Sequence, residues 1–177
     1  ENANLDLDAN YFETIAINVS KDAVFGSIEF SDTEGNDIDV TIDVDANATF
    51  TIDGDLNMNG NVGNQTLTIM GAGNVDLGDL DFNNNANTTA TLDASALTGN
   101  LTVEDSNTGI DVLTSGSGDD TITLATFATV VDAGDGDDFV DMNGLDYGDA
   151  NAATIDGGDG TDTIAIDDGA LLDAATA

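Results

Sequence analysis

The sequence predicts an all-β chain folded as a parallel β-solenoid, in which short strands stack as successive coils. The first observation is a period of two between apolar and polar residues in short runs such as Ile38 to Val44, which is typical of strands. The second is a nine-residue pattern of glycine, aspartate and one apolar position that recurs in the last third of the chain. No window shows a convincing apolar period of 3.6 residues, so helices are not expected to dominate.

Five nonapeptides between residues 106 and 165 follow the pattern G-G-x-G-x-D-x-U-x, where U is apolar, a β-helix repeat that binds Ca²⁺. The copy that begins at Gly157 fills all five defined positions, those at Ser115 and Ala133 fill four each, and the first copy fills three. The third copy keeps only its apolar eighth position, Val131. An apolar residue returns in every copy, which a glycine-rich acidic linker has no reason to keep. The residues predicted to build cation sites are Gly109, Asp111, Gly116, Gly118, Asp120, Gly134, Gly136, Asp138, Gly157, Gly158, Gly160 and Asp162.

Each complete nonapeptide is expected to end in a three-residue strand whose middle side chain points inward, because side chains alternate between the faces of a sheet. The predicted strands are residues 121–123, 139–141 and 163–165. The six residues before each strand must turn the chain sharply, which glycines allow through positive φ and close backbone approach. Two nonapeptides make one coil, so Asp120 and Asp138, which are 18 residues apart, are expected to stack.

Stacked aspartates oppose folding unless a cation lies between them. Coils of a parallel stack lie about 4.8 Å apart. Two carboxylates at that spacing repel by about 1 kcal/mol in water and by about 3.5 kcal/mol at an effective dielectric constant of 20. A Ca²⁺ ion between the two carboxylates turns this repulsion into attraction, and Ca²⁺ takes six to eight oxygens from carboxylates and carbonyls. Mg²⁺ fits less well, because it prefers a tight octahedron and keeps its waters. The predicted cofactor is therefore Ca²⁺.

Alternate turns are expected to lie on opposite edges of the solenoid. Residues 115–120, 133–138 and 157–162 share one edge, and a Ca²⁺ site is predicted between each neighbouring pair of these turns. The second pair is 24 residues apart, so six extra residues around Leu145 to Ala152 must bulge outward. The other edge holds Asp111 but lacks ligands in its next nonapeptide, and it is expected to bind cations poorly.

With these motifs, residues 106–165 resemble the β-roll of the RTX (repeats-in-toxin) family of secreted bacterial proteins. The preceding segments TLTIMGAGNVDLGDLDF and TATLDASALTGNLTV resemble the part of RTX-type surface-layer (S-layer) proteins that lacks nonapeptides. The resemblance implies a right-handed parallel β-roll, Ca²⁺-dependent folding, export by a type I pathway and, for the S-layer branch, assembly into a lattice on the bacterial cell surface. Members of this family are usually far longer, so we expect the chain to be a fragment.

The sequence suggests two regions. Residues 106–177 are predicted to form the RTX β-roll, and residues 1–105 to form less regular solenoid coils. A β-sandwich or an immunoglobulin-like domain is the alternative for residues 1–105. An immunoglobulin-like core would usually contain a tryptophan, and the chain has none.

Charge restricts the partners. The chain has 36 acidic residues against a single basic one, Lys21, and a formal net charge of −35. Without a basic surface, it is not expected to bind nucleic acid or anionic membranes. No stretch approaches the roughly 18 apolar residues that would insert across a bilayer. Calcium ions are the expected partners, although an acidic surface also suits a high-salt habitat.

The residue types argue against an enzyme. The chain contains no His and no Cys, which removes the commonest general base, thiol chemistry and the usual zinc ligands. We therefore expect a structural Ca²⁺-binding module of a secreted S-layer protein that self-associates outside the cell. Cell-surface polysaccharide would be contacted through other parts of the parent protein. The alternatives are a Ca²⁺-dependent adhesin module and the secretion and folding tail of an exported RTX enzyme or toxin.

Overall fold

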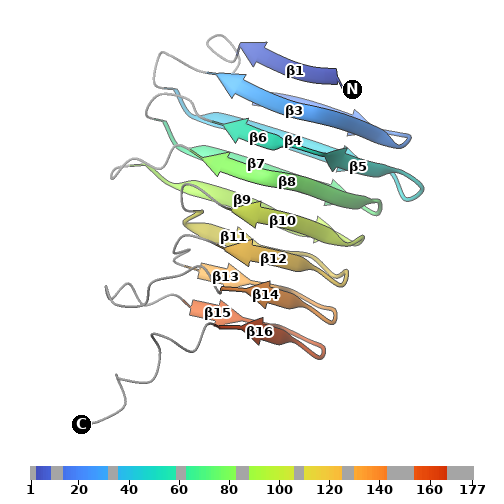
Figure 1. Cartoon of the computed structure of the whole chain (residues 1–177), viewed down its shortest axis with the longest axis vertical. Helices are drawn as coiled ribbons and strands as arrows, with labels where there is room; N and C mark the ends of the chain where they lie inside the picture. Colours follow the sequence, from blue (N-terminus) through green and yellow to red (C-terminus); the bar gives the residue numbers. More distant parts are fainter. Residues whose placement is uncertain are drawn as a thin grey trace.

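The computed structural model describes residues 3–8, 14–31, 36–58, 63–82, 88–105, 110–124, 130–142 and 154–166. Within these ranges the chain is all-β, and its strands form two sheets, one of nine and one of seven strands (Figure 1). The larger sheet, sheet A, contains β1 (Ala3–Asp8), β3 (Ala23–Ser31), β5 (Thr49–Ile52), β6 (Asp55–Met58), β8 (Asn74–Phe82), β10 (Leu101–Asp105), β12 (Thr121–Leu124), β14 (Phe139–Asp141) and β16 (Thr163–Ala165). The smaller sheet, sheet B, contains β2 (Thr14–Val19), β4 (Ile38–Val44), β7 (Gln65–Gly71), β9 (Ala90–Leu97), β11 (Val112–Thr114), β13 (Val130–Asp132) and β15 (Thr154–Asp156). None of the described residues belongs to a helix that could cross a membrane.

The chain alternates between the two sheets, so that each coil takes strands from both. β2 leads into β3, β4 into β5 and β6, and the same order continues to β15 and β16. Strands pair in parallel with those of the neighbouring coils in their own sheet, as β4 does with β2 and β7. This architecture is a parallel β-solenoid, which confirms the predicted fold class. For the described part of residues 1–105 it also excludes the sandwich alternative, because such sandwiches are built from antiparallel sheets.

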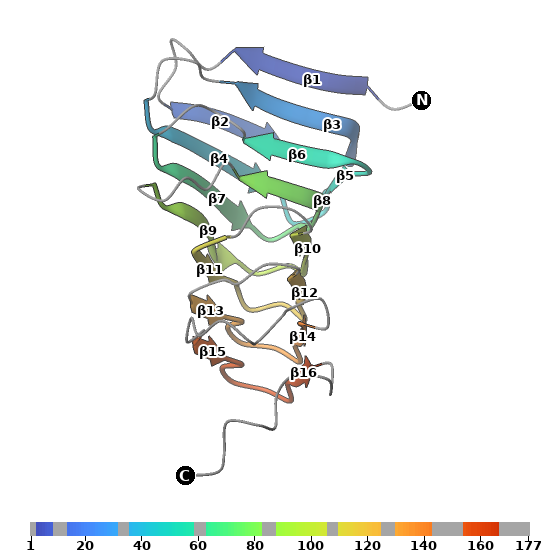
Figure 2. The ribbon, with the colours of Figure 1, turned by 60° about the vertical axis from the view of Figure 1, so that its left-hand side comes forward.

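The coils become narrower toward the C-terminal end (Figure 2). β3 and β8 have nine residues each, whereas β14 and β16 have three. β14 and β16 have the bounds that the nonapeptides predict, and β12 extends one residue beyond its predicted end, to Leu124. Sheet A continues past residue 105, since β10 pairs with both β8 and β12. The division of the chain into two regions at that point stays a prediction.

Columns of apolar side chains fill the space between the sheets. One column in sheet B consists of Ile15, Val40, Leu67, Leu92, Leu113, Val131 and Ile155. Its inner members are buried, whereas Ile15 and Ile155 in the end coils are only partly buried. The eighth nonapeptide positions Ile122 and Val140 are buried as predicted. Ile164 is in register with Val140 yet 42% exposed, because no described coil lies beyond it.

Candidate cation site on the acidic turns

Three acidic turns lie on one edge of the solenoid, as predicted. We call them the first, second and third acidic turn, in the order residues 115–120, 133–138 and 157–162. Each connects a strand of sheet B to a strand of sheet A. Backbone pairing joins them directly: the Asp135 N–H donates to the Gly116 carbonyl at 2.9 Å, and the Asp159 N–H donates to the Gly134 carbonyl at 3.1 Å. The predicted site residue Gly109 and the expected bulge around Leu145 to Ala152 lie outside the described residues.

Glycine is required where one acidic turn rests on the next. Gly134 and Gly158 have φ values of +91° and +78°, and Gly136 and Gly160 have values of +132° and +148°. A Cβ on Gly158 would overlap the carbonyl oxygen of Gly134. The other predicted glycines are similarly close to atoms of the structure: Gly116 to the Leu97 carbonyl, Gly118 to the Gly99 carbonyl, Gly134 to the Gly116 carbonyl, Gly136 to the Gly118 carbonyl, Gly160 to the Gly136 carbonyl, and Gly157 to the side chain of Asp162. The carbonyls of one turn therefore lie directly against the next turn.

The three predicted aspartates of this edge form a ladder along the solenoid. The Asp120 N–H donates to Asp138 Oδ1 at 2.8 Å, and the Asp138 N–H donates to Asp162 Oδ1 at 3.2 Å. At the upper end, the Leu101 N–H donates to Asp120 Oδ1 at 2.7 Å. Each carboxylate thus accepts a hydrogen bond from the preceding coil. The stacking predicted from separations of 18 and 24 residues is confirmed.

A second polar ladder runs beside the first and was not predicted. The Asp137 N–H donates to Asp119 Oδ1 at 3.0 Å, and the Thr161 N–H donates to Asp137 Oδ1 at 2.9 Å. The same ladder continues upward through two asparagines, since Asn100 Oδ1 accepts from the Asp119 N–H and Asn74 Oδ1 accepts from the Asn100 N–H. These side chains accept from the following coil, opposite in direction to the first ladder. A polar residue directly before the sixth nonapeptide position is the sequence signal that could have indicated it.

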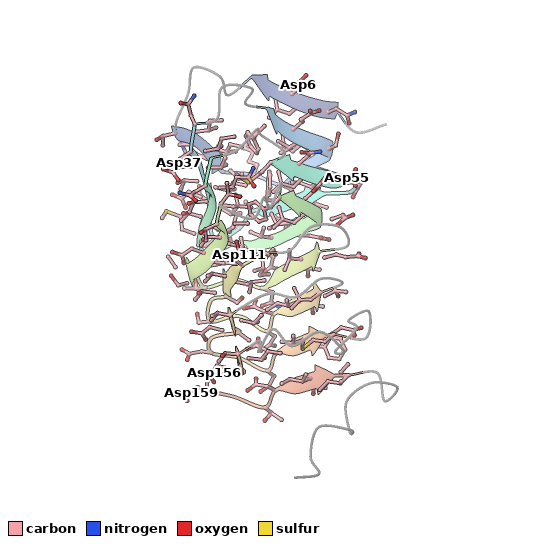
Figure 3. The ribbon with its side chains drawn as sticks, turned by 90° about the vertical axis from the view of Figure 1, so that its left-hand side faces the viewer. Asp6, Asp37, Asp55, Asp111, Asp156 and Asp159 are labelled. Atoms are coloured by element: carbon pink, nitrogen blue, oxygen red, sulfur yellow. The ribbon has the colours of Figure 1, made fainter. Side chains whose placement is uncertain are left out.

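Asp111 lies apart from the acidic turns. It belongs to the connection between β10 and β11, on the opposite edge. Figure 3 shows it midway along the stack, whereas Asp156 and Asp159 lie near the last described coil. Asp111 Oδ2 accepts a hydrogen bond from the Ala90 N–H at 2.9 Å. The structure therefore does not bring this predicted ligand together with Asp120, Asp138 and Asp162.

Asp138 carries an unsatisfied buried oxygen. The residue is only 2% exposed, and among the described residues its Oδ2 atom has no hydrogen-bond partner. A buried acceptor without a partner costs about 1–3 kcal/mol, and more when it is charged. Burial raises the pKa of Asp138 to about 6, the charges of Asp120, Asp162 and Asp119 act in the same direction, and the hydrogen bond from the Asp120 N–H opposes them. Burial also raises the pKa of Asp120.

The donor set of this edge suits a hard cation. Carboxylates and main-chain carbonyls are the oxygen ligands that Ca²⁺ prefers, and its coordination is flexible. The described residues contain no group of three or more His, Cys, Asp or Glu side chains placed to hold a metal. A Ca²⁺ ion at Asp138 would therefore take most of its oxygens from carbonyls and water. Its role would be to neutralise the stacked charges, with the orphaned Oδ2 atom as the carboxylate ligand.

Comparison with known proteins adds no relative. No family model, curated protein or solved structure matches this chain. The assignment of this edge therefore rests on its residues and their geometry.

The raised pKa of Asp138 predicts a pH-dependent stability in the absence of divalent cations. Its folded value of about 6 exceeds the unfolded value of about 3.9, so ionisation opposes folding by about 3 kcal/mol. Stability from this group is fully present below about pH 4 and is lost as the pH rises through about 6. Denaturant unfolding in chelator from pH 4 to pH 8 measures the effect. Asp138→Asn should remove this part and keep only the general repulsion of the acidic chain; equal pH profiles for the two proteins would contradict the prediction.

Proposed function

We propose that this chain is a structural module of a secreted bacterial surface protein of the S-layer type, and that Ca²⁺ stabilises its solenoid at the stacked acidic turns. The observation that carries the proposal is the orphaned Oδ2 of Asp138, a buried carboxylate oxygen among stacked carboxylates. A bound cation would satisfy this oxygen and offset the repulsion between Asp120, Asp138 and Asp162.

The overall charge supports the same role. A formal net charge of −35 favours an expanded chain, so cation binding and folding are expected to be linked. Acidic side chains also meet in register on sheet A, where Asp79 pairs with Asp55 on one side and with Glu104 on the other. Such outward carboxylates suit Ca²⁺ bridges between copies, which is how we expect subunits to join in a surface lattice.

Asparagine at position 138 should abolish most of the stabilisation by Ca²⁺. At a Ca²⁺ concentration of 100 times Kd, a ligand that binds only the folded state adds about 2.7 kcal/mol. For a chain of this size that corresponds to a rise in Tm of about 5–10 °C. Thermal unfolding in chelator and in Ca²⁺ should show this rise for the native chain and little of it for Asp138→Asn.

Asp45→Asn is the matched control. Asp45 is an exposed carboxylate in the turn between β4 and β5, on the same edge, and its replacement removes the same charge. This variant should keep the Ca²⁺ response of the native chain. If Asp138→Asn responds to Ca²⁺ as strongly as Asp45→Asn, the cation does not act at Asp138 and the proposal is wrong.

A further inference from the structure

The buried aspartates of the first and second acidic turns differ in their hydrogen bonds. Asp120 and Asp138 are 1% and 2% exposed, and each accepts an N–H from the coil above through Oδ1. Their Oδ2 atoms differ: that of Asp120 accepts from the Ser115 hydroxyl and from the Gly116 N–H at 3.3 Å, whereas that of Asp138 has no partner within the part of the chain that the structure describes. The same position of the repeat is thus satisfied in one turn and open in the next.

The residue at the first nonapeptide position accounts for one of the two hydrogen bonds that Asp120 Oδ2 has and Asp138 Oδ2 lacks. Ser115 is buried and its hydroxyl donates to Asp120 Oδ2 within the same turn. The equivalent residue of the second turn is Ala133, also buried, which has no side-chain donor. The third turn has Gly157 at this position, again without a donor.

The residue before that position accounts for the other hydrogen bond, the one from the glycine N–H. In the second and third turns it is an aspartate, and its Oδ1 captures the glycine amide: the Gly134 N–H donates to Asp132 at 3.3 Å, and the Gly158 N–H donates to Asp156 at 3.1 Å. In the first turn this residue is Thr114, and the glycine amide donates to Asp120 instead. The Asp-Ala pair of the second turn therefore leaves Asp138 open, and the Thr-Ser pair of the first turn closes Asp120. The third turn has an Asp-Gly pair, and its aspartate, Asp162, is only partly buried.

We propose that Ser115 takes the place of a cation in the first acidic turn, so that this turn stacks without metal and the Ca²⁺ requirement begins at Asp138. This inference rests on the proposed function, because it separates the first acidic turn, which supplies its own donors, from the second, which needs an ion. Two hydrogen-bond donors, the Ser115 hydroxyl and the Gly116 N–H, occupy Asp120 Oδ2, the carboxylate oxygen at which a cation would otherwise bind.

The test is the number of Ca²⁺ ions bound per chain and the Tm in chelator, for the native chain and for Ser115→Ala. Removing the hydroxyl leaves Asp120 Oδ2 with one long hydrogen bond from the Gly116 N–H. Ser115→Ala should therefore have a lower Tm in chelator, bind one Ca²⁺ more than the native chain by calorimetric titration, and recover its Tm in Ca²⁺. Ser117→Ala is the control, because Ser117 is exposed in the same turn and should leave both quantities unchanged.

A second variant, Ser115→Gly, reproduces the residue of the third turn and covers the case in which the alanine variant does not fold. It should show the same gain of one Ca²⁺. If every Ser115 variant that folds binds as many ions as the native chain, the inference is overturned while the proposed function stands. If the native chain binds no Ca²⁺, the proposed function is wrong and the inference is overturned with it.

Discussion

Replacing Phe50 by alanine should lower the free energy of unfolding by about 3–5 kcal/mol, the range for a fully buried phenylalanine. Phe50 is 0% exposed, stands in register with Val75 of the next coil, and lies with its ring centroid 5.9 Å from that of Phe25. Its loss would open a cavity that spans neighbouring coils. Because each coil covers the next, we expect the wide N-terminal coils to unfold together. Denaturant unfolding in saturating Ca²⁺ measures the effect.

Phe139→Ala is the control for this prediction. Phe139 lies on the outer face of β14 and is 38% exposed, so its truncation should cost less than about 1 kcal/mol. Comparable losses for both variants would mean that the apolar columns do not carry the stability of the wide coils.

Replacing Gly134 by alanine is expected to disrupt the second acidic turn. The φ value of +91° alone costs a residue with a Cβ about 1–3 kcal/mol. The new Cβ would also overlap the Gly116 carbonyl, which accepts the Asp135 N–H, so the clash adds to the strain. Amide hydrogen exchange should show loss of protection in β13 to β16 with little change in β4 and β7.

Gly157→Ala provides the comparison, because Gly157 does not have a positive φ and the three atoms nearest to its new Cβ belong to the side chain of Asp162, in the same turn. The Asp162 Cβ and Cγ would lie 2.9 Å from the new atom, so the third turn must shift locally, whereas the contact with the second turn is not clashed directly. The Gly157 variant should therefore lose less protection in these strands than the Gly134 variant. Equal losses for the two glycines would contradict the close stacking of the first and second turns.

The sequence was sufficient for the fold class and for the first aspartate ladder. Nonapeptides of constant length place Asp120 above Asp138, and the apolar eighth positions fix which side chains point inward. For residues 1–105 the sequence left a solenoid and a sandwich open, because alternating apolar and polar residues occur in both. Only strand pairing decides, and the parallel ladder between β4 and β7 is not visible in a period of two.

The second polar ladder and the role of Ser115 were not predicted, for a physical reason. The ladder joins side chains to main-chain amides one coil away, at separations of 26, 19, 18 and 24 residues. Coil length varies outside the nonapeptides, so no fixed period marks these pairs. Ser115 appears in the sequence only as a departure from the first glycine of the repeat. That its hydroxyl donates to Asp120 Oδ2 follows only from the orientation of the Asp120 side chain, which the sequence does not specify.

The most direct test of the Ca²⁺ assignment is a titration of the native chain with Ca²⁺ from chelator, followed by far-UV circular dichroism, with Mg²⁺ as the reference ion. We predict a saturable gain of β signal with Ca²⁺ and not with Mg²⁺, since binding free energy would then contribute to folding. A spectrum that is already fully β in chelator and does not change with Ca²⁺, together with an unchanged Tm, would contradict the assignment. The apolar columns alone would then hold the solenoid together.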